Sequence, residues 1–70
     1  MKNPKTIIDS DITQISSRYA KLKNITTDKA LELFFISKTY KTLVNIETGL
    51  CYEMTDYIYD MFLEEMEESQ

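Results

Sequence analysis

Four carboxylates in the last third of the chain recur at every fourth position, and this spacing is the clearest chemical pattern in the sequence. We call them the acidic row, which consists of Asp56, Asp60, Glu64 and Glu68. Residues four apart share one face of an α-helix and lie about 6 Å apart along its axis. A line of negative charge of this kind imitates a nucleic-acid backbone or binds a basic groove on a protein. The alternative interpretation is a face that only keeps the helix solvated.

One physical point about the acidic row favours a function, while a solvated face remains the ordinary interpretation of a run of charges. Glu65 and Glu67 add two carboxylates to the same segment, and the last basic residue of the chain is Lys41. Acids in the last turn of a helix oppose its dipole, and like charges four residues apart cost a few tenths of a kcal/mol. Residues 1–41 hold eight basic and four acidic residues, whereas residues 42–70 hold eight acidic residues and no basic one. Such asymmetry steers charged partners.

Most catalytic and metal-binding chemistry lacks its residue types here. The 70 residues include no histidine and only one cysteine, Cys51, so the usual zinc ligands are missing and the thiol has no activating base. Adjacent carboxylates on one helix seldom form the closed oxygen cage that Mg²⁺ or Ca²⁺ needs. The single glycine, Gly49, does not make a glycine-rich phosphate loop. The sequence therefore predicts no metal, no cofactor and no enzymatic activity.

The basic residues of the N-terminal half do not predict direct binding to nucleic acid. Two helices joined by residues 23–25 are reminiscent of a helix-turn-helix, but the recognition helix would be residues 27–37. The Leu, Phe and Ile side chains of that segment belong in a core rather than in a groove of DNA. The net charge of −4 also opposes contact with DNA. We interpret the lysines as groups that keep the protein soluble and pair with the acidic helix.

The spacing of apolar residues predicts the helices that position these side chains. Residues 4–22 carry one apolar stripe, which is made of Ile8, Ile12, Ile15, Tyr19 and Leu22. Asn3 is the expected N-cap of this helix, and Pro4 fits its first turn. A second helix over residues 27–37 follows the N-cap Thr26 and is apolar on almost every side. This pattern is typical of a helix that is buried centrally or faces a partner.

A third helical segment and a turn follow. Residues 38–44 keep helical spacing and continue the second helix past a bend. Residues 45–49 are expected to form a turn that ends at Gly49, where a positive φ is tolerated. Residues 50–52 are expected to be extended, as one arm of a small hairpin.

The last helix is expected over residues 56–67, with Thr55 as its N-cap. Its apolar face consists of Ile58, Met61, Phe62 and Met66. Tyr57, Tyr59 and Met61 cannot all face one small core, so part of this aromatic surface should be exposed. Exposed Tyr and Met are common in protein interfaces.

The length of the chain limits the fold to one domain over residues 1–70. The helical patterns predict an all-α domain of three or four helices, with a short extended segment near residues 50–52. A chain of this size is marginally stable alone, and a single cysteine allows no internal disulfide. We therefore expect the protein to form a homodimer. From the helical patterns, we expect Ile15 and Phe34 to be buried in the core.

Hydropathy predicts a soluble, cytoplasmic protein without contact to a membrane. No apolar run approaches the ~20 residues of a membrane-spanning helix. The first residues are not followed by the apolar region of a signal peptide. A single free cysteine agrees with a reducing compartment.

About half of the chain, residues 30–65, resembles a family of small bacterial proteins of Firmicutes type. The shared pattern is a capped helix, Ser37-Lys38-Thr39-Tyr40, Leu43, a turn ending in Gly49, the aromatic Tyr52 and a closing acidic helix. The resemblance implies an accessory module of toxin–antitoxin-like or mobile-element gene clusters, and it implies no particular activity. Cys51 departs from the pattern, which often has a second aromatic residue there.

Taken together, these patterns predict a non-enzymatic protein-interaction module, antitoxin-like or an adaptor, whose acidic C-terminal helix binds a basic surface of a partner protein. The candidate partner-binding residues are Asp56, Tyr57, Tyr59, Asp60, Glu64, Glu65 and Glu68. The alternative is an acidic inhibitor encoded by a phage or mobile element, which mimics nucleic acid and occupies the binding groove of a host enzyme.

Overall fold

The computed structural model describes residues 3–68, and this part of the chain is built from helices without any strand. The four α-helices are α1 (Pro4–Lys23), α2 (Thr27–Phe35), α3 (Lys38–Val44) and α4 (Thr55–Glu68). Two single-turn 3-10 helices, η1 (Ile46–Thr48) and η2 (Leu50–Tyr52), connect α3 to α4. The predicted all-α class is confirmed, with four helices in the described residues. None of these helices is both long and apolar enough to cross a membrane.

Local capping explains where the first three helices begin. The side chain of Asn3 accepts a hydrogen bond from the backbone N–H of Lys5, and Pro4 occupies the first turn of α1. Thr26 caps α2 in the same way by accepting from the N–H of Lys29. The hydroxyl of Ser37 accepts a hydrogen bond from the backbone N–H of Tyr40. This N-cap begins α3 as a helix separate from α2.

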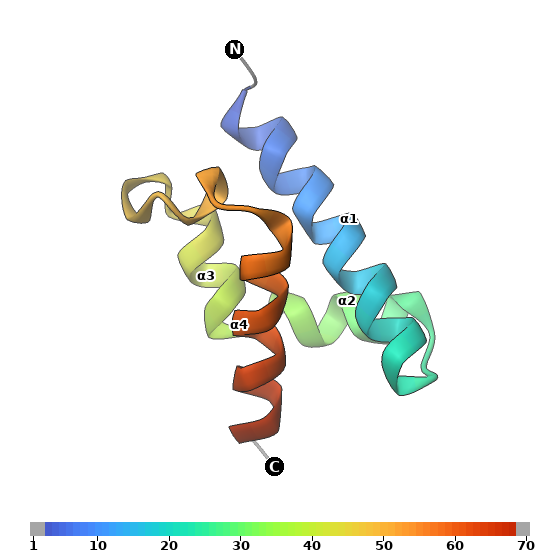
Figure 1. Cartoon of the computed structure of the whole chain (residues 1–70). Helices are drawn as coiled ribbons and strands as arrows, with labels where there is room; N and C mark the ends of the chain where they lie inside the picture. Colours follow the sequence, from blue (N-terminus) through green and yellow to red (C-terminus); the bar gives the residue numbers. More distant parts are fainter. Residues whose placement is uncertain (1–2, 69–70) are drawn as a thin grey trace.

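The helices surround one aromatic core. Figure 1 shows α3 and α4 side by side, with α1 on the other side of α4 and α2 crossing between α1 and α3. Phe34 of α2 and Phe62 of α4 meet edge to face with ring centroids 5.0 Å apart. Tyr19 of α1 contacts the Phe62 ring at 4.9 Å. The predicted burial of Ile15 and Phe34 is confirmed, because both side chains are fully buried.

The predicted stripe of α1 is shorter than its spacing indicated. Ile8, Ile15 and Tyr19 are buried, but Leu22 is 59% exposed. Leu22 lies in the last turn of α1, which Figure 1 shows extending away from α4 toward the loop that leads into α2. The periodicity marks the correct face of α1 but not the point at which the core ends.

The prediction of an extended segment at residues 50–52 is wrong. These residues form η2, in which the N–H of Glu53 donates to the carbonyl of Leu50. Gly49 precedes η2 with a φ of 74°, a conformation that suits glycine. A short local turn closes its own hydrogen bonds, whereas an isolated two-stranded hairpin is marginal in water. Leu50 and Cys51 are buried in the core cluster.

The predicted N-cap of the last helix is also wrong. Thr55 is the first residue of α4, and the carbonyl of Met54 accepts the first hydrogen bonds of the helix. The hydroxyl of Thr55 instead donates to Oδ1 of Asp11 in α1, at 2.7 Å. A contact between two distant segments therefore replaces the expected local cap.

Candidate protein-binding surface

The solvent side of α4 carries the whole acidic row, because Asp56 is exposed as well. Asp60, Glu64 and Glu68 are exposed, and Glu67 is exposed beside them. At about 100° per residue, these carboxylates and that of Asp56 span an arc of about 120° around the helix. Ile58 and Phe62 occupy the opposite side and are fully buried. One helix therefore supplies part of the core and presents an acidic face to solvent.

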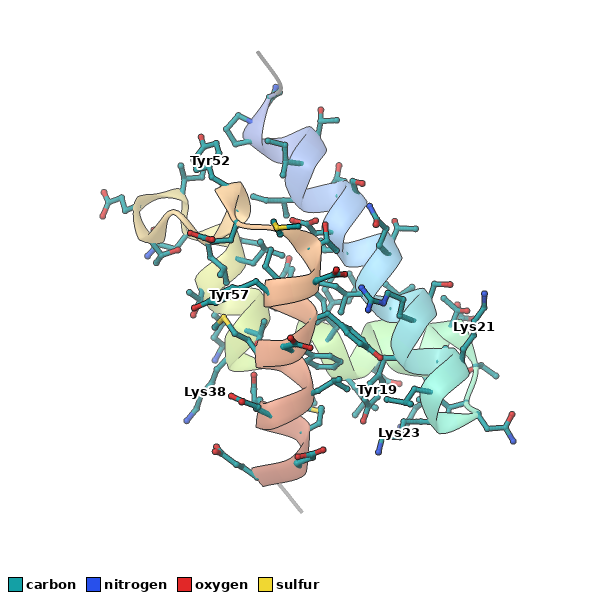
Figure 2. All side chains as sticks on the ribbon, viewed as in Figure 1. Tyr19, Lys21, Lys23, Lys38, Tyr52 and Tyr57 are labelled. Carbon is teal, nitrogen blue, oxygen red and sulfur yellow. The ribbon has the colours of Figure 1, made fainter. Side chains whose placement is uncertain are left out.

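Four of these carboxylates have no cationic partner within residues 3–68. The two ion pairs found there join Arg18 to Asp56 and Lys29 to Glu32. In Figure 2, Lys38 lies on one side of α4, and Lys21 and Lys23 lie on the other side at the end of α1. The carboxylates without an ion pair are Asp60, Glu64, Glu67 and Glu68. We call these four residues the open acidic face.

Asp56 belongs to the acidic row but already has a partner. Its Oδ1 lies 2.6 Å from a guanidinium nitrogen of Arg18 in α1. The Arg18 guanidinium carbon also lies 4.2 Å from the centre of the Tyr59 ring, which is a cation–π contact. The Arg18 and Asp56 side chains are 46% and 73% exposed, so their ion pair contributes at most about 1 kcal/mol. This cluster connects α1 to α4 within the fold.

The two candidate tyrosines lie in different environments. Tyr59 is 7% exposed and belongs to the core, beneath Arg18. Tyr57 is 55% exposed, and Figure 2 shows its side chain directed away from α1. The structure therefore leaves Tyr57, and not Tyr59, accessible beside the open acidic face.

Glu65 connects α4 to the beginning of α3. Its carboxylate accepts hydrogen bonds from the backbone N–H groups of Lys38 and Thr39, at 2.7 and 2.9 Å, and from the Thr39 hydroxyl at 2.8 Å. Burial raises the pKa of Glu65, but these hydrogen bonds and the nearby Lys38 charge outweigh it and hold the pKa below its ordinary value. Glu65 thus satisfies the first N–H groups of α3.

A shallow groove of about 240 Å³ runs between α3 and α4. The half-buried side chain of Met61 lines it, and the carboxylates of Glu64 and Glu68 lie on its α4 side. Its α3 side consists of Lys38, Thr39 and Thr42. The α4 side of the groove combines an apolar surface with negative charge, and Lys38 is the one cationic residue of its described lining. The α4 side suits a long basic side chain, because such a side chain has an aliphatic stem and a cationic tip.

Sequence patterns did not identify Asp11, which the structure places in the core. Its side chain is 3% exposed, and burial raises its pKa although the Thr55 hydroxyl acts in the opposite direction. The available signal was its position, three residues after Ile8 and four before Ile15. An acid at that spacing lies on the buried stripe of an amphipathic helix.

Comparison of the chain with protein-family models, with curated proteins and with solved structures finds no match. Within residues 3–68, no group of three or more Cys, Asp and Glu side chains is arranged to hold a metal ion.

Proposed function

We propose that this protein is a non-enzymatic, cytoplasmic interaction module, antitoxin-like or an adaptor, that binds a basic surface of a partner protein through α4. The observation that carries the proposal is the open acidic face, whose four exposed carboxylates have no cation paired with them in the described residues.

The open acidic face does not help the protein to fold. Glu67 and Glu68 lie in the last turn of α4, where the helix dipole disfavours negative charge. Asp60, Glu64 and Glu68 also repel one another at four-residue spacing. A basic partner would reverse both effects, because it neutralises the charges that the isolated helix leaves unopposed.

The groove beside α4 indicates how a partner would be held. A lysine or arginine of the partner would lay its aliphatic stem on Met61 and direct its charge toward Glu64 and Glu68. Exposed Tyr57 would add an aromatic contact at the other end of the same face. The remaining candidates, Asp56, Tyr59 and Glu65, already make contacts within the fold, through which they would also influence binding.

The test compares two variants that change the net charge equally. The first neutralises the open acidic face (Asp60→Asn, Glu64→Gln, Glu67→Gln and Glu68→Gln). The matched control neutralises four exposed acids elsewhere (Asp9→Asn, Asp28→Asn, Glu47→Gln and Glu53→Gln). The protein and both variants are used as baits in cells that encode it, and the captured partner is then purified for binding measurements.

We expect the first variant to associate more slowly with the partner and to lose most of the salt dependence of binding, because electrostatic steering depends on the charges at the interface. The control variant should keep both properties. Equal affinity and equal salt dependence for the two variants would leave the open acidic face as a solvated surface and refute the proposal.

A nucleic-acid mimic remains the second candidate, and it is favoured because the four carboxylates of the open acidic face form no ion pair within residues 3–68. In this case the partner is a nucleic-acid-binding enzyme whose groove α4 occupies. Competition distinguishes the two candidates, because a mimic is displaced by DNA or RNA oligonucleotides, whereas a partner bound elsewhere is not.

A further inference from the structure

A second pocket, of about 260 Å³, lies between the first half of α1 and the beginning of α4. It is separate from the groove beside the open acidic face, and the two share no lining residue. It is lined by the apolar Ile7 and by five residues with polar side chains, which are Thr6, Ser10, Asp11, Gln14 and Thr55. A pocket of this size is smaller than those that bind drug-sized ligands, so it fits a short ligand or a single side chain.

Asp11 lines this pocket, and one of its two carboxylate oxygens lacks a hydrogen-bond donor within the described residues. Only 3% of Asp11 is exposed, and its Oδ1 accepts a hydrogen bond from the Thr55 hydroxyl. Its Oδ2 is covered from solvent and has no partner in the described residues. A buried acceptor without a donor costs about 1–3 kcal/mol, and more when it is charged. Native proteins seldom keep such a group unless a ligand, an ion or water satisfies it.

The pocket contains the chemistry for a cationic donor and not for an anion. Its lining supplies a carboxylate, hydroxyl groups and an amide, and it contains no Lys or Arg. Gln14 donates an amide N–H to the hydroxyl of Ser10, so this N–H is already used within the protein and is not offered to an anion. A single carboxylate is a poor site for Mg²⁺ or Ca²⁺, which take several hard oxygen ligands.

A primary ammonium group matches these acceptors because it carries three N–H donors and one positive charge. Ile7 offers an apolar surface for the carbon chain that bears the ammonium. Oδ2 is covered in the folded protein, so an ammonium reaches it after the Asp11 side chain turns about its Cα–Cβ bond, which is a change between staggered rotamers. We propose that this pocket binds a primary ammonium group on a short aliphatic chain, with Asp11 as the carboxylate that receives it.

The ammonium can come from a free amine or from a lysine side chain of another protein. These two sources share the same chemistry and differ in the groups that flank the chain. The inference does not depend on the proposed function of α4, because no residue of the open acidic face lines this pocket.

The first experiment titrates the ¹⁵N-labelled protein with n-butylammonium chloride at constant ionic strength and follows the backbone amide signals. We expect saturable shifts confined to the segments around Ser10 and Thr55. The neutral analogue 1-butanol has the same carbon chain and should not produce these shifts. If 1-butanol produces equal shifts, or if butylammonium produces none, the proposal is wrong.

The second experiment repeats the titration with two variants. Asp11→Asn removes the charge and keeps the shape, and Asp9→Asn removes an exposed carboxylate two residues away in the same helix. Loss of a charge-assisted hydrogen bond should weaken binding to Asp11→Asn at least about tenfold, whereas Asp9→Asn should bind as the unmodified protein does. Equal binding to both variants would overturn the proposal, and the 1-butanol comparison decides the matter if Asp11→Asn does not fold.

The third experiment identifies the source of the ammonium. Nα-acetyl-lysine N-methylamide replaces butylammonium in the same titration. Saturable shifts at the same signals would show that the pocket accepts a lysine within a polypeptide. Binding of butylammonium alone would restrict the site to free amines.

Discussion

Asp11 is held at the boundary between α1 and α4 by one hydrogen bond, although its carboxyl is buried. Burial raises its pKa above the ordinary value, and the Thr55 hydrogen bond only partly opposes this. A carboxyl whose pKa rises on folding stabilises the protein when it is protonated. That contribution is complete below the ordinary carboxyl pKa and is lost as the pH rises through the raised value. At neutral pH, therefore, burial of Asp11 makes the fold less stable than it is in acid.

We expect Asp11→Asn to be more stable than the unmodified protein at pH 7, because a neutral amide is less costly to bury than a carboxylate. The difference should shrink as the pH falls and Asp11 takes up its proton. Urea unfolding between pH 7 and pH 3 measures both effects. Asp9→Asn is the control and should show no such trend. A variant less stable than the unmodified protein at pH 7 would contradict this account of Asp11.

At the scale of the elements, Glu65 shows a contribution of the opposite sign. Its pKa is lowered in the folded protein by its hydrogen bonds to Lys38 and Thr39. A group with a lowered pKa stabilises the fold above its ordinary pKa, and this stabilisation is lost as the pH falls through the lowered value. The connection between α3 and α4 should therefore weaken in acid.

We expect Glu65→Gln to destabilise the protein by about 1 kcal/mol at neutral pH, as the loss of a helix cap typically does. Glu64→Gln is a close control, because Glu64 is the neighbouring residue and is exposed. It should be neutral or slightly stabilising, since it relieves repulsion along the row. Chemical denaturation at pH 7 compares the two. Equal effects would show that the contact of Glu65 with α3 adds no stability.

The same elements show what the sequence could predict about the fold. Asn3 and Thr26 cap their helices as predicted, because such local signals are visible in a sequence. Ser37 was predicted inside the second helix, but α2 ends before this residue, which is the N-cap of a separate α3. The apolar spacing also marked the buried side of α4, because Ile58 and Phe62 belong to one periodic pattern. The helical class and most helix bounds therefore follow from local chemistry.

The features that were missed depend on contacts between distant segments. Glu65 was predicted as a partner-binding residue, but it accepts hydrogen bonds from Lys38 and Thr39, which lie 27 and 26 positions earlier in the chain. Thr55 was predicted as a cap, but its hydroxyl reaches Asp11, 44 positions away. Tyr59 was predicted at the surface, but Arg18 covers it. No spacing rule reveals these pairs before the helices are packed. Whether the open acidic face binds a partner stays a prediction.

At the scale of the whole molecule, several large apolar side chains remain exposed. Met54 is 74% exposed and Tyr52 61%, and both lie in the segment that leads into α4. Ile36, at the junction of α2 and α3, is 72% exposed. These side chains, rather than the whole of α2, are the surfaces that a second copy would cover, since Ala30 and Phe34 of α2 are already in the core.

We expect the protein to dimerise at micromolar concentration, because a chain of this length gains stability by covering such side chains. Light scattering over a range of concentrations measures the dimer. Ile36→Glu and Met54→Glu each place a charge on one of the two surfaces, so the variant that dissociates the dimer identifies the interface. A monomer at every concentration with a melting temperature above ~65 °C would contradict this expectation.

Because α4 provides both Phe62 to the core and the open acidic face to solvent, the folding of the protein and the binding of a partner to this face would be linked equilibria. A partner that binds this face only when α4 is folded would raise the free energy of unfolding by about 2.7 kcal/mol when its free concentration is about a hundred times its Kd. Proteases in cells attack the unfolded chain, so the lifetime of this protein would follow the supply of its partner. Its abundance would then report how much of that partner the cell contains.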